Sequence, residues 1–216
     1  GTLWLGRSRW GVGIAKGPIS QYDVDPLRLG WYLDWMTQID PPRPDGITYA
    51  QMIRVHGDEL QPNVEEITDI ALANPGSLWM VGNEPDVIWQ GNAIPATYAR
   101  LYHDAYTAIK DADPTARVAI GGVSQPTPLR LRYLDEILES YRRQFGTEMP
   151  VDVWNTHNFI LQEKRGSWGV DIPPGLPDEQ GMLYEVDDSD NLEIFRQQIV
   201  DFRRWMARRG YQNTPL

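Results

Sequence analysis

The feature that most constrains the fold is a repeating order of short apolar strand, polar loop and amphipathic helix. Strands that alternate with helices predict a parallel sheet covered by helices. The expected fold class is α/β, of the (β/α)8 TIM-barrel type, with residues 1–216 forming one domain. Six segments have the length and apolar content of strands: 9–15, 30–36, 51–57, 78–84, 117–123 and 151–159.

Helices are expected after the later strands, whereas the first two strands are followed by loop-like segments. The predicted helices cover 62–73, 95–111, 128–144 and 190–209. The last one has an apolar stripe that we expect to pack on a sheet, an N-cap among residues 188–190 and an end at Gly210. Its stripe consists of Leu192, Phe195, Ile199, Phe202 and Met206. The Gly-rich stretch 11–17 lies mostly inside the first strand and opens no helix, so a dinucleotide-binding fold is not favoured.

Charge and composition exclude several classes of partner. The net charge of −10 comes from 20 Lys and Arg against 30 Asp and Glu, which argues against nucleic acid. No apolar run approaches the roughly 18 residues that span a bilayer, so no membrane is expected. The chain lacks Cys, which excludes disulfides and thiolate metal sites and leaves the compartment open. It starts at Gly1, so either a removed leader or an excised piece is compatible with it.

Polar residues stand where the apolar strands end. The third strand ends in His56, the fourth in Asn83-Glu84, the fifth runs into Ser124-Gln125, and the sixth ends in His157-Asn158. In a βα barrel the carboxyl ends of all strands surround one mouth, so these groups are expected to converge. The 9 Trp and 10 Tyr supply flat apolar faces with one donor each, which suit sugars. The alternative is that a large barrel simply buries many aromatic side chains.

The most specific of these strand ends is "LWMVGNEPD", residues 78–86. Pro85 is expected to hold Glu84 in an extended backbone, with its carboxyl at the strand tip. A partly desolvated carboxyl in a mouth rimmed by aromatics can serve as a general acid. The alternative is a structural glutamate that pairs with an arginine at the rim.

This segment resembles the acid/base segment of the retaining glycoside hydrolases built on (β/α)8 barrels. In that clan the fourth strand ends in Asn-Glu, often followed by Pro. The resemblance implies that Glu84 is the general acid/base and that Asn83 binds a sugar 2-hydroxyl. "NTHNF" resembles the sixth-strand segment and suggests that His157 lines the subsite at the scissile bond. The other candidates for substrate binding are His56, Asn158 and the sugar platforms Trp31, Trp35, Trp89 and Trp168.

The implied mechanism needs a second carboxylate, about 5–5.5 Å from the first. In the clan it ends the seventh strand, which we expect just beyond residue 216, so the seventh and eighth strands and the nucleophile are expected to be absent. Glu163 and Glu185 are the alternatives within the chain. The acidic stretch 184–190 is better explained by helix-dipole stabilisation than by a metal, and the three His show no ligand spacing, so neither a metal nor a cofactor is expected.

An incomplete barrel would expose the edges of its first and last strands. We therefore expect self-association through these edges, exchange of elements between copies, or a longer chain of which this is a piece. The resemblance implies an oligo- or polysaccharide substrate, and such enzymes are commonly exported. This chain alone is expected to be inactive or nearly so. Two alternatives remain: a non-catalytic carbohydrate-binding barrel, and an interaction module completed by a partner. No motif specifies the glycan, its linkage, or exo against endo cleavage.

Overall fold

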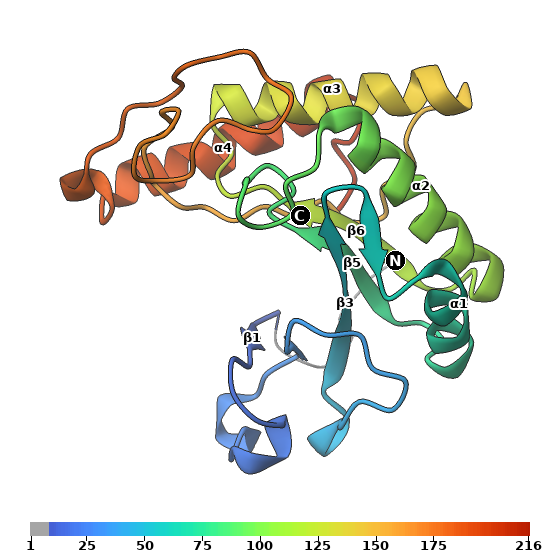
Figure 1. Cartoon of the computed structure of the whole chain (residues 1–216). Coiled ribbons are helices and arrows are strands. Elements are labelled where there is room, and N and C mark those ends of the chain that lie inside the picture. Colours follow the sequence, from blue (N-terminus) through green and yellow to red (C-terminus); the bar gives the residue numbers. More distant parts are fainter. Residues whose placement is uncertain (1–8) are drawn as a thin grey trace.

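The computed structural model of the chain describes residues 9–216 and has the α/β class expected. Five strands pair in parallel and follow one another in chain order, which is the arrangement of strands in the wall of a (β/α)8 barrel (Figure 1). They are β1 Gly11–Gly13, β2 Trp31–Leu33, β3 Thr48–His56, β5 Leu78–Asn83 and β6 Arg117–Gly122. The short strand β4, Glu59–Gln61, forms an antiparallel hairpin with β3 that the sequence did not predict.

The predicted sixth strand occupies its expected place beside β6 without forming a continuous ladder. Two isolated parallel bridges pair it with the sheet, Ala119 with Val153 and Val123 with Thr156, and backbone hydrogen bonds such as Ile120 N to Val153 O at 3.2 Å support them. The carboxylate of Asp152 accepts the Val118 N–H at 3.0 Å, so a side chain takes the place of a strand carbonyl there. On its other side, Trp154 N donates to Pro215 O at 2.9 Å, so the last residues lie alongside this segment.

Four helices cover one side of the sheet, each close to its predicted range. They are α1 Val64–Ala73, α2 Pro95–Ala112, α3 Pro128–Phe145 and α4 Leu192–Arg208. A capping box between Asn63 and Glu66 begins α1, and Pro occupies the first position of both α2 and α3. Among the described residues, no helix has the length and apolar character needed to cross a bilayer.

Two expectations for α4 were wrong. Its N-cap is Asn191, whose side chain accepts from Glu193 N and Ile194 N, while Val186–Asp188 forms a separate 3-10 turn. The predicted stripe packs only in its second half, where Phe202 and Met206 are buried together with Trp205. Leu192 is 80% exposed and Phe195 and Ile199 are also exposed, because the described chain passes over only the C-terminal half of the stripe.

The sheet has two apolar faces. Towards the helices lie Ile53, Trp79, Val81, Val118 and Ile120, which belong to the main core. The inner face of the barrel wall carries a smaller cluster of Leu33, Ala50, Met52, Met80 and Ala119. As expected, β1 and β2 are followed by loops with short 3-10 turns instead of helices, and this part has its own small core around Tyr32 and Tyr49. Figure 1 shows it at the opposite end of the sheet from α3 and α4.

Candidate functional site

Glycine at the end of β5 turns Asn83 into the barrel. Gly82 has a φ of +93°, and a Cβ on it would lie 3.2 Å from Val55 Cγ2 and 3.5 Å from the Tyr98 ring, both on the helix-covered side. Gly82 therefore occupies the outer face, and the next residue, Asn83, faces inward, where it lines a hollow. The left-handed backbone that this requires favours glycine.

Glu84 does not have the extended backbone that Pro85 predicts. Its φ is +44°, in the left-handed region. Glu84 O accepts from both Val87 N and Gly91 N at 3.1 Å, so the chain reverses directly after the strand. Gly91 permits the reversal, because a Cβ on it would lie 2.6 Å from Pro85 Cα. The hydrogen bonds of the loop thus override the local preference that proline sets.

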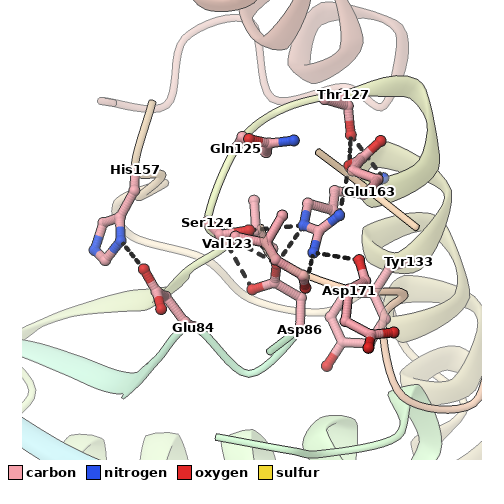
Figure 2. Close-up of polar contacts among 12 residues, drawn as sticks. Glu84, Asp86, Val123, Ser124, Gln125, Thr127, Tyr133, His157, Glu163 and Asp171 are labelled. Atoms are coloured by element: carbon pink, nitrogen blue, oxygen red, sulfur yellow. Dashed lines mark hydrogen bonds and ion pairs between the residues drawn. The ribbon is translucent and has the colours of Figure 1, made fainter. Parts of the chain in front are cut away.

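The side chain of Glu84 contacts His157. Glu84 Oε1 lies 2.7 Å from His157 Nδ1, with side-chain exposures of 12% and 26% (Figure 2). His157 N donates to Val123 O at 2.8 Å, which fixes the backbone of His157 beside the end of β6. A contact of this length requires a proton between the two atoms, on either the carboxyl or the imidazole. Glu84 is therefore paired with a titratable histidine and not with an arginine.

A hollow of about 580 Å³ opens at the tips of β3 and β5. Four of the predicted binding residues line it together: Trp35, His56, Asn83 and Trp89. His56 Nδ1 lies 3.1 Å from Gln90 O, and Trp89 is 55% exposed. Among residues 9–216, no donor reaches Asn83 Oδ1, although this atom is shielded from solvent. An enclosed acceptor without a donor is costly in a folded chain, and the side chain that carries this oxygen lines the hollow.

A second hollow of about 510 Å³ adjoins the first. The two share the lining residues Trp35, Met52, Arg54 and Gln61, so together they form one groove across the end of β3. The far end of the groove reaches Glu66 and Asp69 on α1. Trp35 is 37% exposed and has a φ of +65°, which is an outlier for a bulky side chain. The groove therefore combines an exposed indole with several polar side chains.

The remaining predicted residues lie elsewhere. Asn158 turns towards α4, where its Nδ2 donates to Phe195 O at 2.9 Å. Trp31 packs against the inner-face core, and its Nε1 donates to Arg9 O at 3.2 Å. Trp168 is 40% exposed in the loop after residue 157 and does not line either hollow. Ser124 and Gln125 are fully buried, so they serve the structure of the strand ends.

A buried ionic cluster stands behind the Glu84 loop, and the sequence did not predict it. Arg130, on the first turn of α3, is fully buried together with Asp86 and Glu163. Arg130 Nε donates to Asp86 Oδ2 at 2.6 Å, and its Nη1 donates to Glu163 Oε1. We call these three residues the Arg130 cluster. Figure 2 shows Asp86 directed away from His157, towards Ser124, on the other side of the loop from Glu84.

The pKa of Tyr133 shows that water is excluded from this region. Burial, with the charge of Asp86 nearby, raises the pKa of Tyr133 well above its usual value, so the phenol stays a neutral donor to Ala93 O at 2.6 Å.

His103 is structural: it contacts the Tyr141 hydroxyl at 2.9 Å and stacks on Phe145 with ring centroids 3.7 Å apart. Within 9–216, no group of three or more His, Asp or Glu side chains is arranged to hold a metal ion.

Comparison with known proteins places this geometry on a known fold. No protein-family model matches the chain, and no curated protein sequence resembles it. Among solved structures, a GH128 (subgroup III) curdlan-specific exo-β-1,3-glucanase from Blastomyces gilchristii, in complex with glucose, is 17% identical with a TM-score of 0.59. The match covers 97% of this chain and 73% of the glucanase.

Two endo-β-1,3-glucanases are also similar. The GH128 (subgroup II) enzyme from Sorangium cellulosum is 22% identical with a TM-score of 0.53, over 72% of this chain and 62% of the enzyme. The GH128 (subgroup I) enzyme from Amycolatopsis mediterranei, in complex with laminaritriose, is 18% identical with a TM-score of 0.52, over 74% and 60%. The chain thus spans about 60% of the length of these two endo-glucanases. The likeness shows that the fold is the strand-and-helix arrangement of these glycoside hydrolases.

Proposed function

We propose that this chain is the larger part of a glycoside hydrolase domain that binds a gluco-oligosaccharide in the groove across β3, with Glu84 as its general acid/base. The proposed substrate class is β-1,3-linked glucan, because the structural neighbours are β-1,3-glucanases and one of them is in complex with laminaritriose. The groove supports an oligosaccharide over a single sugar, since two adjoining hollows share Trp35 and Arg54.

The observation that carries the proposal is the state of Asn83. Its Oδ1 is enclosed and receives no donor from the described residues, and the Asn83 side chain lines a hollow with two indoles. Sugars present hydroxyl donors around a ring whose apolar face stacks on indole. If the Asn83 amide rotates towards the hollow, a sugar hydroxyl can donate to its oxygen, and the same ring could stack on Trp35 or Trp89.

Backbone strain at Glu84 and at Trp35 supports the proposal. Glu84 and Trp35 both have positive φ values, and neither is a residue type that readily accepts them. Strain of this kind costs about 1–3 kcal/mol per residue and gathers at active sites and ligand clamps. Here one strained residue is the candidate acid and the other lines both halves of the groove.

In the proposed reaction, protonated Glu84 gives its proton to the glycosidic oxygen as the bond to the anomeric carbon breaks, and the second carboxylate forms a bond to that carbon. His157 holds the carboxyl in place through the 2.7 Å contact and accepts or returns the shared proton as Glu84 changes state. In the retaining form of the mechanism, the Glu84 carboxylate later takes a proton from the attacking water. Asn83 would hold the sugar through its hydroxyl during both steps.

The proposal assigns the nucleophile to neither of the alternatives within the chain. Glu163 is fully buried and its oxygens are held by Arg130, Thr127 and the Met182 N–H. Glu185 is exposed and takes part in a backbone capping arrangement with Asp188. The second carboxylate is proposed to come from a segment outside these 216 residues.

Titration of tryptophan fluorescence with laminaritriose tests the proposal on the chain as it is. Saturable binding that weakens in Asn83→Ala, but not in the control Trp168→Ala, would support it. No saturable response, or a response that Asn83→Ala leaves unchanged, would reject the site. A parallel assay for reducing ends separates the alternatives: a longer version of the chain that binds sugar without releasing them would be a non-catalytic carbohydrate-binding barrel.

A further inference from the structure

Arg130 joins the three loops that carry or border the candidate site. It binds Asp86 in the loop after β5 and Ser124 after β6, at 2.6 Å and 2.7 Å. Its other nitrogens bind Glu163 and the carbonyls of Val170 and Asp171, at 2.8 Å and 3.2 Å for the two carbonyls. A single side chain therefore holds three segments that are far apart in the sequence.

The partners of Arg130 are themselves saturated. Asp86 accepts from the Ser124 hydroxyl at 2.7 Å and from Ser124 N. Glu163 accepts from Thr127 and, at 2.6 Å, from Met182 N. Removing charges from water is costly, and fully bonded geometry of this kind is what offsets the cost. The arrangement leaves little freedom for any of the three loops.

Two short connections lead from this cluster to the candidate site. Asp86 follows Glu84 by two residues, with Pro85 between them. Ser124 directly follows Val123, whose carbonyl accepts His157 N at 2.8 Å, and Ser124 O accepts Phe159 N at 3.2 Å. The backbone on both sides of the Glu84–His157 contact is thus attached to groups that Arg130 holds.

We propose that Arg130 is a positioning residue: it acts through Asp86 and Ser124 to hold Glu84 and His157 in contact. The view that the Glu84–His157 contact belongs to a functional site rests on the proposed function. The effect of Arg130 on that contact is independent of it. The planar guanidinium is needed because it binds two carboxylates and two carbonyls along fixed directions, which an ammonium group cannot do.

The test is the resonance of the proton shared by Glu84 and His157 in the chain of 216 residues. Whether it rests on Glu84 Oε1 or on His157 Nδ1, a proton held in this contact gives a downfield ¹H signal, which His157→Gln identifies by its loss. Arg130→Lys keeps the positive charge and loses the planar guanidinium with its N–H donors in fixed directions. We expect the exchange of this proton to become at least about tenfold faster in Arg130→Lys, with smaller acceleration in Ser124→Ala.

The matched control is Arg209→Lys, which alters a second arginine that binds a carboxylate. Arg209 lies at the surface and donates to both oxygens of Asp135 on α3, at 2.6 Å and 2.7 Å. It should leave the His157 signal unchanged. Far-UV circular dichroism establishes that each variant is folded, and Ser124→Ala carries the test if Arg130→Lys does not fold. Equal exchange in the wild type and in the folded Arg130 or Ser124 variant would overturn the proposal. Absence of sugar binding would reject the proposed function and leave this result untouched.

Discussion

Glu84 and Asp86 are two carboxylates on either side of one proline, and their surroundings are opposite. Asp86 is fully buried, and its oxygens accept from Ser124 and Arg130. Glu84 is partly exposed and has a side-chain contact with His157, beside an Asn83 oxygen that no donor among residues 9–216 reaches. One carboxylate is saturated by the protein, whereas the other keeps acceptor capacity for a ligand.

This difference separates groups that hold the fold from groups that can do chemistry. A saturated buried carboxylate contributes to the geometry of its neighbours and has no capacity left for a substrate. A carboxylate with a single titratable partner can gain and lose a proton where a substrate can reach it. Substitution of Asp86 should therefore lower stability more than substitution of Glu84, and substitutions around Glu84 should affect ligand binding more than stability.

The largest effect is expected for Asp86→Asn. Weakening one partner of a buried ion pair leaves Arg130 without full compensation, and such losses cost about 3–5 kcal/mol. Urea unfolding followed by circular dichroism measures the change. The matched control is Glu84→Gln, for which we expect a change below about 1 kcal/mol. A similar loss in both variants would mean that the two carboxylates do not differ in the way proposed.

Asn83→Ala should lower the affinity for laminaritriose about tenfold, because a hydrogen bond to the ligand is lost. The free chain should keep or slightly gain stability, since an enclosed oxygen without a donor is removed. Fluorescence titration and urea unfolding of the same preparation measure both effects. A clear loss of stability with unchanged affinity would show that Asn83 belongs with Asp86 among the structural groups.

Trp35→Gly should weaken binding and relieve backbone strain. Glycine accepts the φ of +65° without a steric cost, so Trp35→Gly should be about 1 kcal/mol more stable than Trp35→Ala, which loses the same indole and keeps the strain. Loss of the indole that lines both hollows should weaken oligosaccharide binding. Trp89→Gly, at a residue outside the positive-φ set, serves as the control for backbone strain. A Trp35→Gly chain less stable than Trp35→Ala would contradict backbone strain at this position.

The smallest effect concerns a third carboxylate, Asp113. Burial alone would raise its pKa, but hydrogen bonds from Thr115 and Gly76, with the charge of Lys110 nearby, lower it below the usual 3.8. Because the folded pKa is depressed, its stabilisation is present above pH 3.8 and is lost as the pH falls through the folded value. Asp113→Asn should therefore cost about 1 kcal/mol near pH 7 and almost nothing at the acid end. A cost that does not vary with pH would contradict this assignment.

Sequence patterns predicted the features that depend on local order. Strand and helix periodicity placed the sheet in chain order, and the polar residues at strand ends predicted that Glu84 and His157 would lie together, 73 positions apart. The backbone of Glu84 was not predictable from Pro85, because hydrogen bonds to Val87 and Gly91 set it. The Arg130 cluster was missed because its pairs are 44 and 33 positions apart, and no periodic pattern marks a buried arginine.

The position of segment 151–159 was predictable from its sequence, whereas its hydrogen-bond pairing was not. Its apolar content correctly indicated a place beside β6, but ladder formation depends on which backbone groups are free to pair. There the Asp152 carboxylate takes a strand N–H, and two isolated bridges result. For α4, the apolar spacing predicted a continuous buried stripe, whereas burial depends on which parts of the chain pass over it.

Binding of laminaritriose mapped by ¹⁵N NMR of the chain shows directly whether the groove holds the sugar. We expect the side-chain amide of Asn83 and the indole N–H signals of Trp35 and Trp89 to shift together, with one dissociation constant. The buried indole of Trp154 should not move. Shifts confined to other parts of the chain, or no shift at saturating sugar, would contradict the assignment of this groove as the carbohydrate site.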